Sequence, residues 1–525
     1  MIDHTVRSTA NDEGGAAQTS RRARRTLLPR ENFLGVWVLS SLVLFLLCAV
    51  WSLATPLGAS PDEGAQVVKA AATVRGELIG QPAPGLSTAT RAFRVPAVFK
   101  SIYRLPRCYQ FRSSVPAGCA PHLHSSGRLV TVTSYVGRYP PLYYAIVGLP
   151  TLAMHSEGVI YFMRLISALI DSILLGLALA VAAIWVRSTM VLAALALTIT
   201  PLVVFLCGVV NPSGFEIAAA ICAWTSGLAL VRPRESGPSR RLVVTFVVSG
   251  CLLELTRGLS VLWMVLIVLT MIALEPRSCR ELLRARSVRI GVLVLGAVGA
   301  LALTFVLLAD TLTVVSSIEL PPDHAAIGAL ILKVLGQIGV YFNQFIGVFG
   351  WLDTPSPLLT MVLWTSLFGF LIVVGLVFSR VRHAWVLLGL VGGSLVLTVT
   401  IVVWHAASSG VTWQARDGFP LYAGIPLLAG FVMSDHPFVS SARRTRKRVA
   451  AVVAIGVGTG QLADFVWALR RNTVGLGHTF NLFARVRGGW SPPWGTPLVV
   501  ALGAVAVVLY AAWLRRQMAH FQSQP

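Results

Sequence analysis

Long apolar stretches recur along the chain, and many of them are long enough to cross a bilayer as a helix. The first, 33–54, contains no charged residue. Inside hydrocarbon every backbone amide needs a partner within the protein, and a helix supplies those partners within one segment. Of the 525 residues, 55% are hydrophobic and 12% are charged, and the mean hydropathy is +0.74. This composition excludes a soluble globular protein of the same size and predicts an all-α integral membrane protein.

Basic residues separate many of the apolar stretches. The chain has 43 Lys and Arg against 21 Asp and Glu, a net charge of +22, and the excess falls largely in short clusters. Such clusters orient a membrane protein, so the charge does not predict a nucleic-acid partner. The topology that places the clusters on one side has about twelve spans and both termini in the cytoplasm. Residues 1–32 are predicted to be a disordered basic tail without a cleavable signal peptide, and residues 515–525 a cytoplasmic C-terminal tail.

The predicted membrane domain covers residues 33–514. The spans that can be bounded at both ends are 33–54, 159–186, 190–209, 217–231, 242–255 and 258–274. The remaining spans are one that ends near Asp310, two that flank 380–383, one that leads to 443–448, and two around a loop at 470–496. The apolar segments 140–147 and 327–350 are predicted to be interfacial helices. A long first loop, 55–139, and a second segment, 310–357, are predicted to be extracytoplasmic.

Unusual polar residues gather on the predicted extracytoplasmic face. They are Asp62, Glu63, Arg138, Asn211, Glu216, Arg257, Asp353, Arg416 and Asp417. Any one of them is more often solvated or paired than functional, because the ends of spans are polar in every membrane protein. Their convergence on one face is the stronger signal, and it predicts a site there.

Asp62 and Glu63 follow the first span, and three roles are open for them. The pair could bind a divalent cation, act as a general base, or cap a helix that begins at Ser60-Pro61. Arg257 lies between two apolar runs without a polar loop to solvate it. It therefore needs an anionic partner, for which Asp62, Glu216 or a lipid phosphate are candidates.

Two of the seven cysteines, Cys108 and Cys119, fall in the first loop. An oxidising exterior would permit a disulfide between them. The chain has no Walker loop, no zinc-type Cys/His spacing, no nucleophile elbow and no dinucleotide fingerprint. An enzyme of this kind must therefore receive its energy-rich substrate within the membrane.

An ordered series of short motifs resembles a family of bacterial multi-pass membrane proteins, domain of unknown function 2142. The motifs are PDE at 61–63, RYPPLYY at 138–144, NPSGFE at 211–216, FGWLDTP at 349–355 and QAR at 414–416. The resemblance covers about Phe33 to Leu514. This family is similar in layout to the GT-C glycosyltransferases, so the resemblance implies a GT-C-like helical bundle with a long first extracytoplasmic loop, in the bacterial cytoplasmic membrane.

The resemblance also implies an activity: transfer of a sugar from a polyprenyl-phosphate donor to a cell-envelope or glycoprotein acceptor outside the cytoplasm. Asp62 would then be the general base or a metal ligand, with Glu63 beside it. Arg257 and Arg416 would bind the donor phosphate, and Tyr143 and Tyr144 would line the opening toward the lipid. Here Asp417 follows Arg416, and it could neutralise that arginine.

Two other functions remain open from the sequence. A transporter or flippase of lipid-linked sugars would carry ionisable residues at mid-span, for which Asp171 and Glu254 are candidates. A polymerase or ligase of envelope polysaccharide would place its main functional loop late in the chain, whereas here the largest loop comes first. The partners expected for the glycosyltransferase are the lipid-linked sugar and membrane lipids. The sequence leaves the sugar, the acceptor, the metal requirement and the oligomeric state open.

Overall fold

A computed structural model describes residues 32–87, 90–232, 237–312, 323–434 and 443–519. Nearly all of the predicted N-terminal tail, and residues 520–525 of the predicted C-terminal tail, lie outside these ranges. The last helix continues to Ala519, beyond the predicted end of the membrane domain at Leu514.

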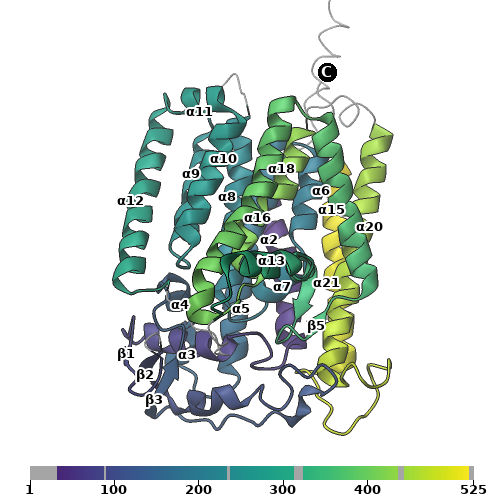
Figure 1. Cartoon of the computed structure of the whole chain (residues 1–525). Coiled ribbons are helices and arrows are strands. Elements are labelled where there is room, and N and C mark those ends of the chain that lie inside the picture. The colour runs from purple at the N-terminus through teal and green to yellow at the C-terminus, as the bar shows by residue number, and fades with distance from the viewer. Residues whose placement is uncertain (1–31, 88–89, 233–236, 313–322, 435–442, 520–525) are drawn as a thin grey trace, which may run out of the picture.

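Long helices run side by side through most of the molecule (Figure 1). Within the described ranges, eight helices are long and apolar enough to cross a membrane, or up to eleven if each bent pair is one span. The eight are α2 (Phe33–Ala54), α5 (Val159–Val181, prolonged by η4, Ala182–Val186), α8 (Pro212–Val231), α12 (Arg286–Leu308), α15 (Leu358–Phe378), α16 (Val381–Ser409), α20 (Arg443–Thr473) and α21 (Thr496–Ala519). The chain is a multi-pass membrane protein, as the sequence predicts.

Among the described helices, three pairs are bent. They are α6 (Thr189–Thr198) with α7 (Pro201–Cys207), α10 (Ser260–Leu274) with α11 (Pro276–Leu282), and α13 (Ile327–Gly336) with α14 (Ile338–Gly347). Pro201 and Pro276 begin the second helix of their pairs, where proline ends the preceding helix and fits the next first turn. Two of the predicted spans correspond to the helices α9 (Arg240–Glu254) and α18 (Gly424–Val432), which are too short to be counted as membrane-crossing by length. The predicted number of about twelve spans is therefore higher than the number of helices that are long enough.

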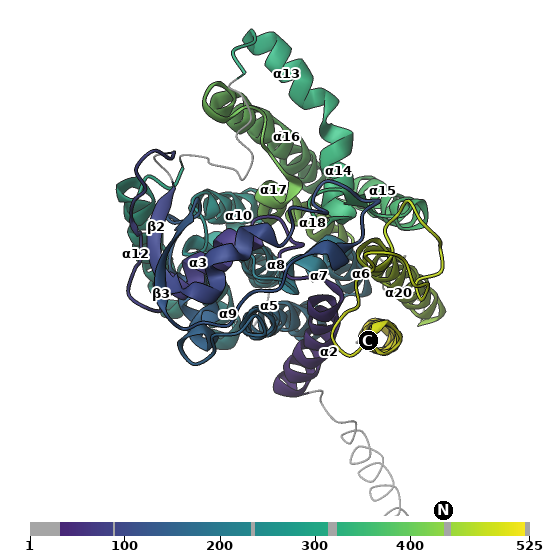
Figure 2. The ribbon, with the colours of Figure 1, turned by 90° about the horizontal axis from the view of Figure 1, so that it is seen from below.

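The pair α13–α14 runs across the bundle rather than along it. Figure 1 shows α13 end-on, and Figure 2 shows it extending sideways from the other helices. Its side chains Ile327 and Leu332 are 68% and 71% exposed. This is the arrangement expected of an interfacial helix, which the sequence predicts for 327–350. The other predicted interfacial segment forms only a short helix, α4 (Leu142–Val147), followed by η3 (Leu149–Leu152).

Residues 55–139 pack at one end of the bundle and include strands, so the chain is not wholly helical (Figure 1). Helix α3 (Glu63–Thr73) lies beside an antiparallel sheet of order β1-β2-β3, formed by Gln81–Pro82, Arg91–Pro96 and Leu129–Ser134. Arg91 pairs with Ser134 and Pro96 with Leu129. Short 3₁₀ turns η1 (Ala97–Arg104) and η2 (Ala117–Cys119) complete the segment. Hydropathy alone finds spans, and it does not detect strands this short.

The bundle has a basic end and a looped end. The Arg-rich helix α11 lies at the opposite end from β1–β3 (Figure 1). The beginning of α2 meets the end of α21 there, where Trp513 Nε1 donates to Ser40 Oγ over 2.9 Å. At the looped end, the short helix α17 (Ala415–Tyr422) contacts residues 55–139 through Arg416, which binds Asp62. The two-stranded pair β4 (Val348–Phe349) and β5 (Thr354–Pro355) also lies at this end, because Trp351 between the strands donates to the carbonyl of Gly58.

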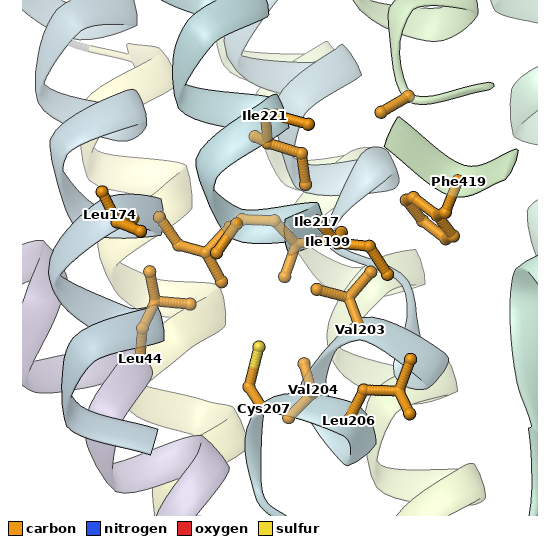
Figure 3. Packing of buried hydrophobic residues seen from close by; sticks show 14 of the residues in the cluster. Leu44, Leu174, Ile199, Val203, Val204, Leu206, Cys207, Ile217, Ile221 and Phe419 are labelled. Atoms are coloured by element: carbon orange, nitrogen blue, oxygen red, sulfur yellow. The ribbon is translucent and has the colours of Figure 1, made fainter. Parts of the chain in front are cut away.

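Helix α8 is the centre of the packed core. All residues of its apolar stretch are buried, whereas only 22% of those in the apolar stretch of α12 are. Figure 3 shows Ile217 and Ile221 of α8 beside Leu174 of α5, Leu44 of α2 and the α6–α7 region. Small residues such as those at 218–220 allow neighbouring helices to approach closely. The polar first turns of α8 are therefore held rigidly at the looped end.

Candidate functional site

A cavity of about 370 Å³ opens at the looped end of the bundle. Its wall includes residues from 61–62, from the turn between α9 and α10, from the last turns of α16 and from α17. Among the described residues, the charged side chains in its lining are Asp62, Glu216, Arg257, Arg416 and Asp417. All five were named from the sequence, and the fold brings them together from distant parts of the chain.

Asp62 directs its carboxylate at two donors in this region. Tyr135 Oη donates to Oδ1 over 2.8 Å, and Arg416 Nη2 donates to Oδ2. Helix α3 begins at Glu63, slightly later than the expected start at Ser60-Pro61, and the side chain of Asp62 makes these contacts in place of a cap. Its φ of 66° is left-handed, a conformation that is uncommon for a residue other than glycine. The capping role is therefore corrected: the backbone marks the helix start, and the carboxylate points elsewhere.

Glu63 lies outside the cavity lining and is 1% exposed. Its two oxygens accept from Arg164 Nε over 2.7 Å and from Nη2 over 2.6 Å. They also accept from the amides of Gly58 and Val210. With both oxygens held by four donors, Glu63 is corrected from a candidate base or metal ligand to a structural ion pair. Arg164 was missed by the sequence reasoning, although a lone arginine inside an apolar span signals a buried anionic partner.

Arg257 is held between two carboxylates. Its Nη1 donates to Glu216 Oε2 over 3.1 Å, and its Nη2 donates to Asp417 Oδ1 over 3.0 Å. Glu216 is fully buried, and its Oε1 accepts from Ser260 Oγ over 2.6 Å. Of the two carboxylates considered as partners of Arg257, it binds Glu216, and it also binds Asp417, which was not considered.

Helix α17 carries Arg416 and Asp417 as neighbours with different partners. Asp417 completes a capping box at the start of α17, in which its Oδ2 accepts from the backbone N–H of Gln414 over 3.1 Å. Its other oxygen binds Arg257, so Asp417 does not neutralise Arg416 as the sequence suggested. Arg416 binds Asp62 instead. Among the charged groups described in the lining, three carboxylates face two guanidinium groups.

Three further candidates have structural partners outside the cavity lining. Arg138 forms an ion pair with Asp310 over 2.5 Å. Asn211 caps α8 by accepting from the Ser213 amide over 3.0 Å. Asp353 pairs with Arg471, which is 2.6 Å away. These residues are corrected from cavity candidates to contacts that fix the loops around it.

Tyr143 and Tyr144 are both fully buried, so the expectation that they line an opening toward the lipid is corrected. Tyr143 Oη lies 2.9 Å from Ser167 Oγ, and Tyr144 Oη donates to Gln66 Oε1 over 2.5 Å. A tyrosine with a partner for its hydroxyl packs well in a core, and its sequence pattern is the same as that of an interfacial tyrosine.

The segment 55–139 holds two other features of note. Cys108 and Cys119 form a disulfide with a Cα–Cα distance of 6.2 Å. Lys69 is fully buried beneath the sheet, where it donates to the carbonyls of Leu78 and of Gly137. Burial lowers the pKa of the Lys69 ammonium group to about 7.

The described residues around the cavity provide few ligands for a divalent cation. Within the described ranges, no three His, Cys, Asp or Glu side chains cluster in a way that could hold a metal ion. Asp62 and Glu63 point to different partners, so the two do not form a shared ligand pair. Other polar side chains in the lining, among them Tyr135, Gln344 and His405, were missed by the sequence reasoning.

Comparison with known proteins gives a family and similar solved structures. Crystal structures of ArnT from Cupriavidus metallidurans, in the apo state and bound to undecaprenyl phosphate, are each 13% identical to this chain with a TM-score of 0.41. Each alignment covers 92% of this chain and 77% of the ArnT chain. No curated protein matches the sequence. The family described as predicted membrane protein (DUF2142) matches residues 45–425, which include all five charged residues of the cavity. The chain therefore belongs to the DUF2142 family of membrane proteins.

Proposed function

We propose that this protein is a GT-C-type membrane glycosyltransferase. It transfers a sugar from a polyprenyl-phosphate donor to a cell-envelope or glycoprotein acceptor on the extracytoplasmic side. One observation carries the proposal: a carboxylate, Asp62, and two guanidinium groups, Arg257 and Arg416, line a single cavity at the end of an apolar bundle.

The reaction needs these groups. The acceptor hydroxyl oxygen attacks C1 of the sugar, and the bond between C1 and the phosphate oxygen breaks. The electron pair of that bond leaves with the polyprenyl phosphate, and the hydroxyl proton passes to a base. Asp62 is the base in this proposal, and a positioned base typically contributes about 10²–10⁴-fold. Guanidinium groups stabilise the charge that develops on the leaving phosphate.

The position of the cavity suits a lipid-linked donor. Gln344 of α14 lies in the cavity wall, and its Oε1 accepts from the Ala415 amide over 2.9 Å. The pair α13–α14 extends sideways from the bundle with apolar side chains exposed, as helices at the lipid headgroup level do. A phosphate at the headgroup level would reach the cavity without leaving the membrane surface.

The two arginines take different parts in this proposal. Arg416 pairs with Asp62, and it is the first ligand of the donor phosphate. Arg257 is bound by Glu216 and Asp417, so it contributes positive potential from a fixed position. The orientation is part of the proposal: the Arg-rich connections face the cytoplasm with both termini, and the cavity faces outward.

Asp62→Asn tests the proposal in proteoliposomes supplied with a panel of polyprenyl-phosphate sugars and envelope extract as acceptor. Transfer of labelled sugar should fall by at least about 100-fold, because the amide cannot accept the proton. Glu157→Gln is the matched control, since Glu157 is partly exposed, pairs with His122 over 3.2 Å and lies outside the cavity lining. It should transfer sugar like the wild type. Undiminished turnover in Asp62→Asn, at equal protein level, would remove Asp62 from the mechanism.

A further inference from the structure

The proposed base and the proposed phosphate ligand bind each other in this structure. Asp62 Oδ2 accepts from Arg416, and Oδ1 accepts from Tyr135. The Asp62 and Arg416 side chains are 17% and 11% exposed, so water screens the pair only partly. Both carboxylate oxygens of Asp62 therefore already accept from protein donors, so neither oxygen faces an acceptor hydroxyl unpaired. An arginine bound to a carboxylate is likewise not open to a phosphate.

We propose that the Asp62–Arg416 ion pair is a latch that the donor phosphate opens. The phosphate takes Arg416 from Asp62, and Asp62 can accept the acceptor's proton only after that exchange. The inference rests on the proposed function and adds an order to it: the donor binds before the acceptor is activated.

The geometry assigns the exchange to Arg416 rather than to Arg257. Arg257 is held by Glu216, which is fully buried, and by Asp417, which is fixed in the cap of α17. Releasing it would leave the fully buried Glu216 carboxylate without its cation. Among the described residues, Arg416 has a single carboxylate partner, Asp62, which lies at the cavity wall. At Arg416 the donor phosphate would therefore simply take the place of the Asp62 carboxylate.

The charges balance through the reaction. The donor is a phosphodiester with one negative charge, so it can replace the Asp62 carboxylate at Arg416 one for one. When C1 passes to the acceptor oxygen, the hydroxyl proton moves to Asp62 and the leaving phosphate monoester gains negative charge. Protonated Asp62 cannot compete for Arg416 at that stage. The latch closes again after Asp62 releases its proton and the polyprenyl phosphate departs.

The latch predicts that Asp62 competes with phosphate for Arg416. A suitable probe is farnesyl methyl phosphate, a short phosphodiester with one charge, bound to the purified full chain in nanodiscs. Asp62→Asn should bind the probe about tenfold more tightly than the wild type, equivalent to about 1.4 kcal/mol. Asp417→Asn removes the same charge from the same cavity but leaves Arg416 paired. The affinity of this variant for the probe should rise by less than about threefold, and that rise measures the general effect of removing one negative charge.

A double variant isolates the pair. Arg416→Gln should weaken binding of the probe. When Asp62→Asn is added to Arg416→Gln, the affinity for the probe should rise by no more than it does in Asp417→Asn. The latch would be overturned if Asp62→Asn and Asp417→Asn raised the affinity for the probe equally, or if Asp62→Asn still raised it about tenfold in the absence of Arg416. Either result would leave the glycosyltransferase proposal in place. Failure of the wild type and all variants to bind the probe would overturn both.

A measurement on the wild type covers the case in which a variant does not fold. Carbodiimide and glycinamide label accessible carboxyl groups, and mass spectrometry compares Asp62 with the reference Glu157. The probe should accelerate labelling of Asp62 several-fold relative to Glu157, because it releases Asp62 from Arg416. An unchanged or reduced ratio at saturating probe would contradict the latch.

Discussion

The two adjacent carboxylates should differ sharply in what their removal costs. Glu63→Gln leaves Arg164, which is fully buried, without its anion. Arg164 also donates to the carbonyls of Ser52, Thr55 and Pro56, so it joins the end of α2 to α5. Removing one partner of a buried ion pair costs about 3–5 kcal/mol. Asp62→Asn breaks a pair that retains some exposure, and it should cost about 1 kcal/mol or less.

The assay is the free energy of unfolding of the purified protein in mixed micelles, titrated with SDS and followed by tryptophan fluorescence. Adding Arg164→Met to Glu63→Gln should restore part of the lost stability, because the unpaired charge is then gone. Equal losses for Glu63→Gln and Asp62→Asn, or no recovery in the double variant, would refute the assignment of Glu63 to structure and Asp62 to the site.

Three other outcomes follow from the described contacts. Lys69 has a pKa of about 7 in the folded chain, below its value of 10.5 when exposed, so the unfolded state binds more protons between those values. The melting temperature should therefore rise from pH 7 to pH 9, and Lys69→Met should flatten that rise. Loss of the Cys108–Cys119 disulfide, by Cys119→Ser, should lower stability by about 2–3 kcal/mol, and a reductant should then have no further effect. Tyr135→Phe removes a 2.8 Å hydrogen bond to Asp62 and should slow sugar transfer about tenfold, far less than Asp62→Asn.

The sequence predicts the membrane character of the fold because hydropathy and basic clusters report on it directly. The sequence pattern also predicts an interfacial helix at 327–350, and in the structure α13–α14 lies across the bundle. The small sheet β1–β3 could not be predicted in the same way. Its strands are two to six residues long and pair within a polar segment, where no apolar run marks them.

The candidate site was predictable as a set of residues but not as a set of pairs. Asp62, Arg257 and Arg416 come to one cavity, as the convergence of polar motifs on one face suggests. The partner of each charge depends on contacts between distant segments: Asp62 and Arg416 are 354 residues apart, and Glu63 and Arg164 are 101 apart. One sequence carries no signal for such pairings, so Glu63 was given a role in the site and Asp417 was expected to neutralise Arg416.

Tyr143 and Tyr144 show the same limit at the level of burial. Hydroxyl partners from α3 and α5 make both side chains part of the core. The segment around them is apolar with a polar edge, which describes an interfacial helix and a buried one equally well.

The proposed reaction breaks the bond between a sugar and a polyprenyl phosphate. The most direct measurement supplies the purified protein in proteoliposomes with a polyprenyl-phosphate sugar and acceptor extract, and follows the lipid by mass spectrometry. We predict that the wild type converts it to free polyprenyl phosphate and that Asp62→Asn does not. Movement of the intact lipid-linked sugar between leaflets, with no polyprenyl phosphate released, would rule out the glycosyltransferase and indicate a flippase.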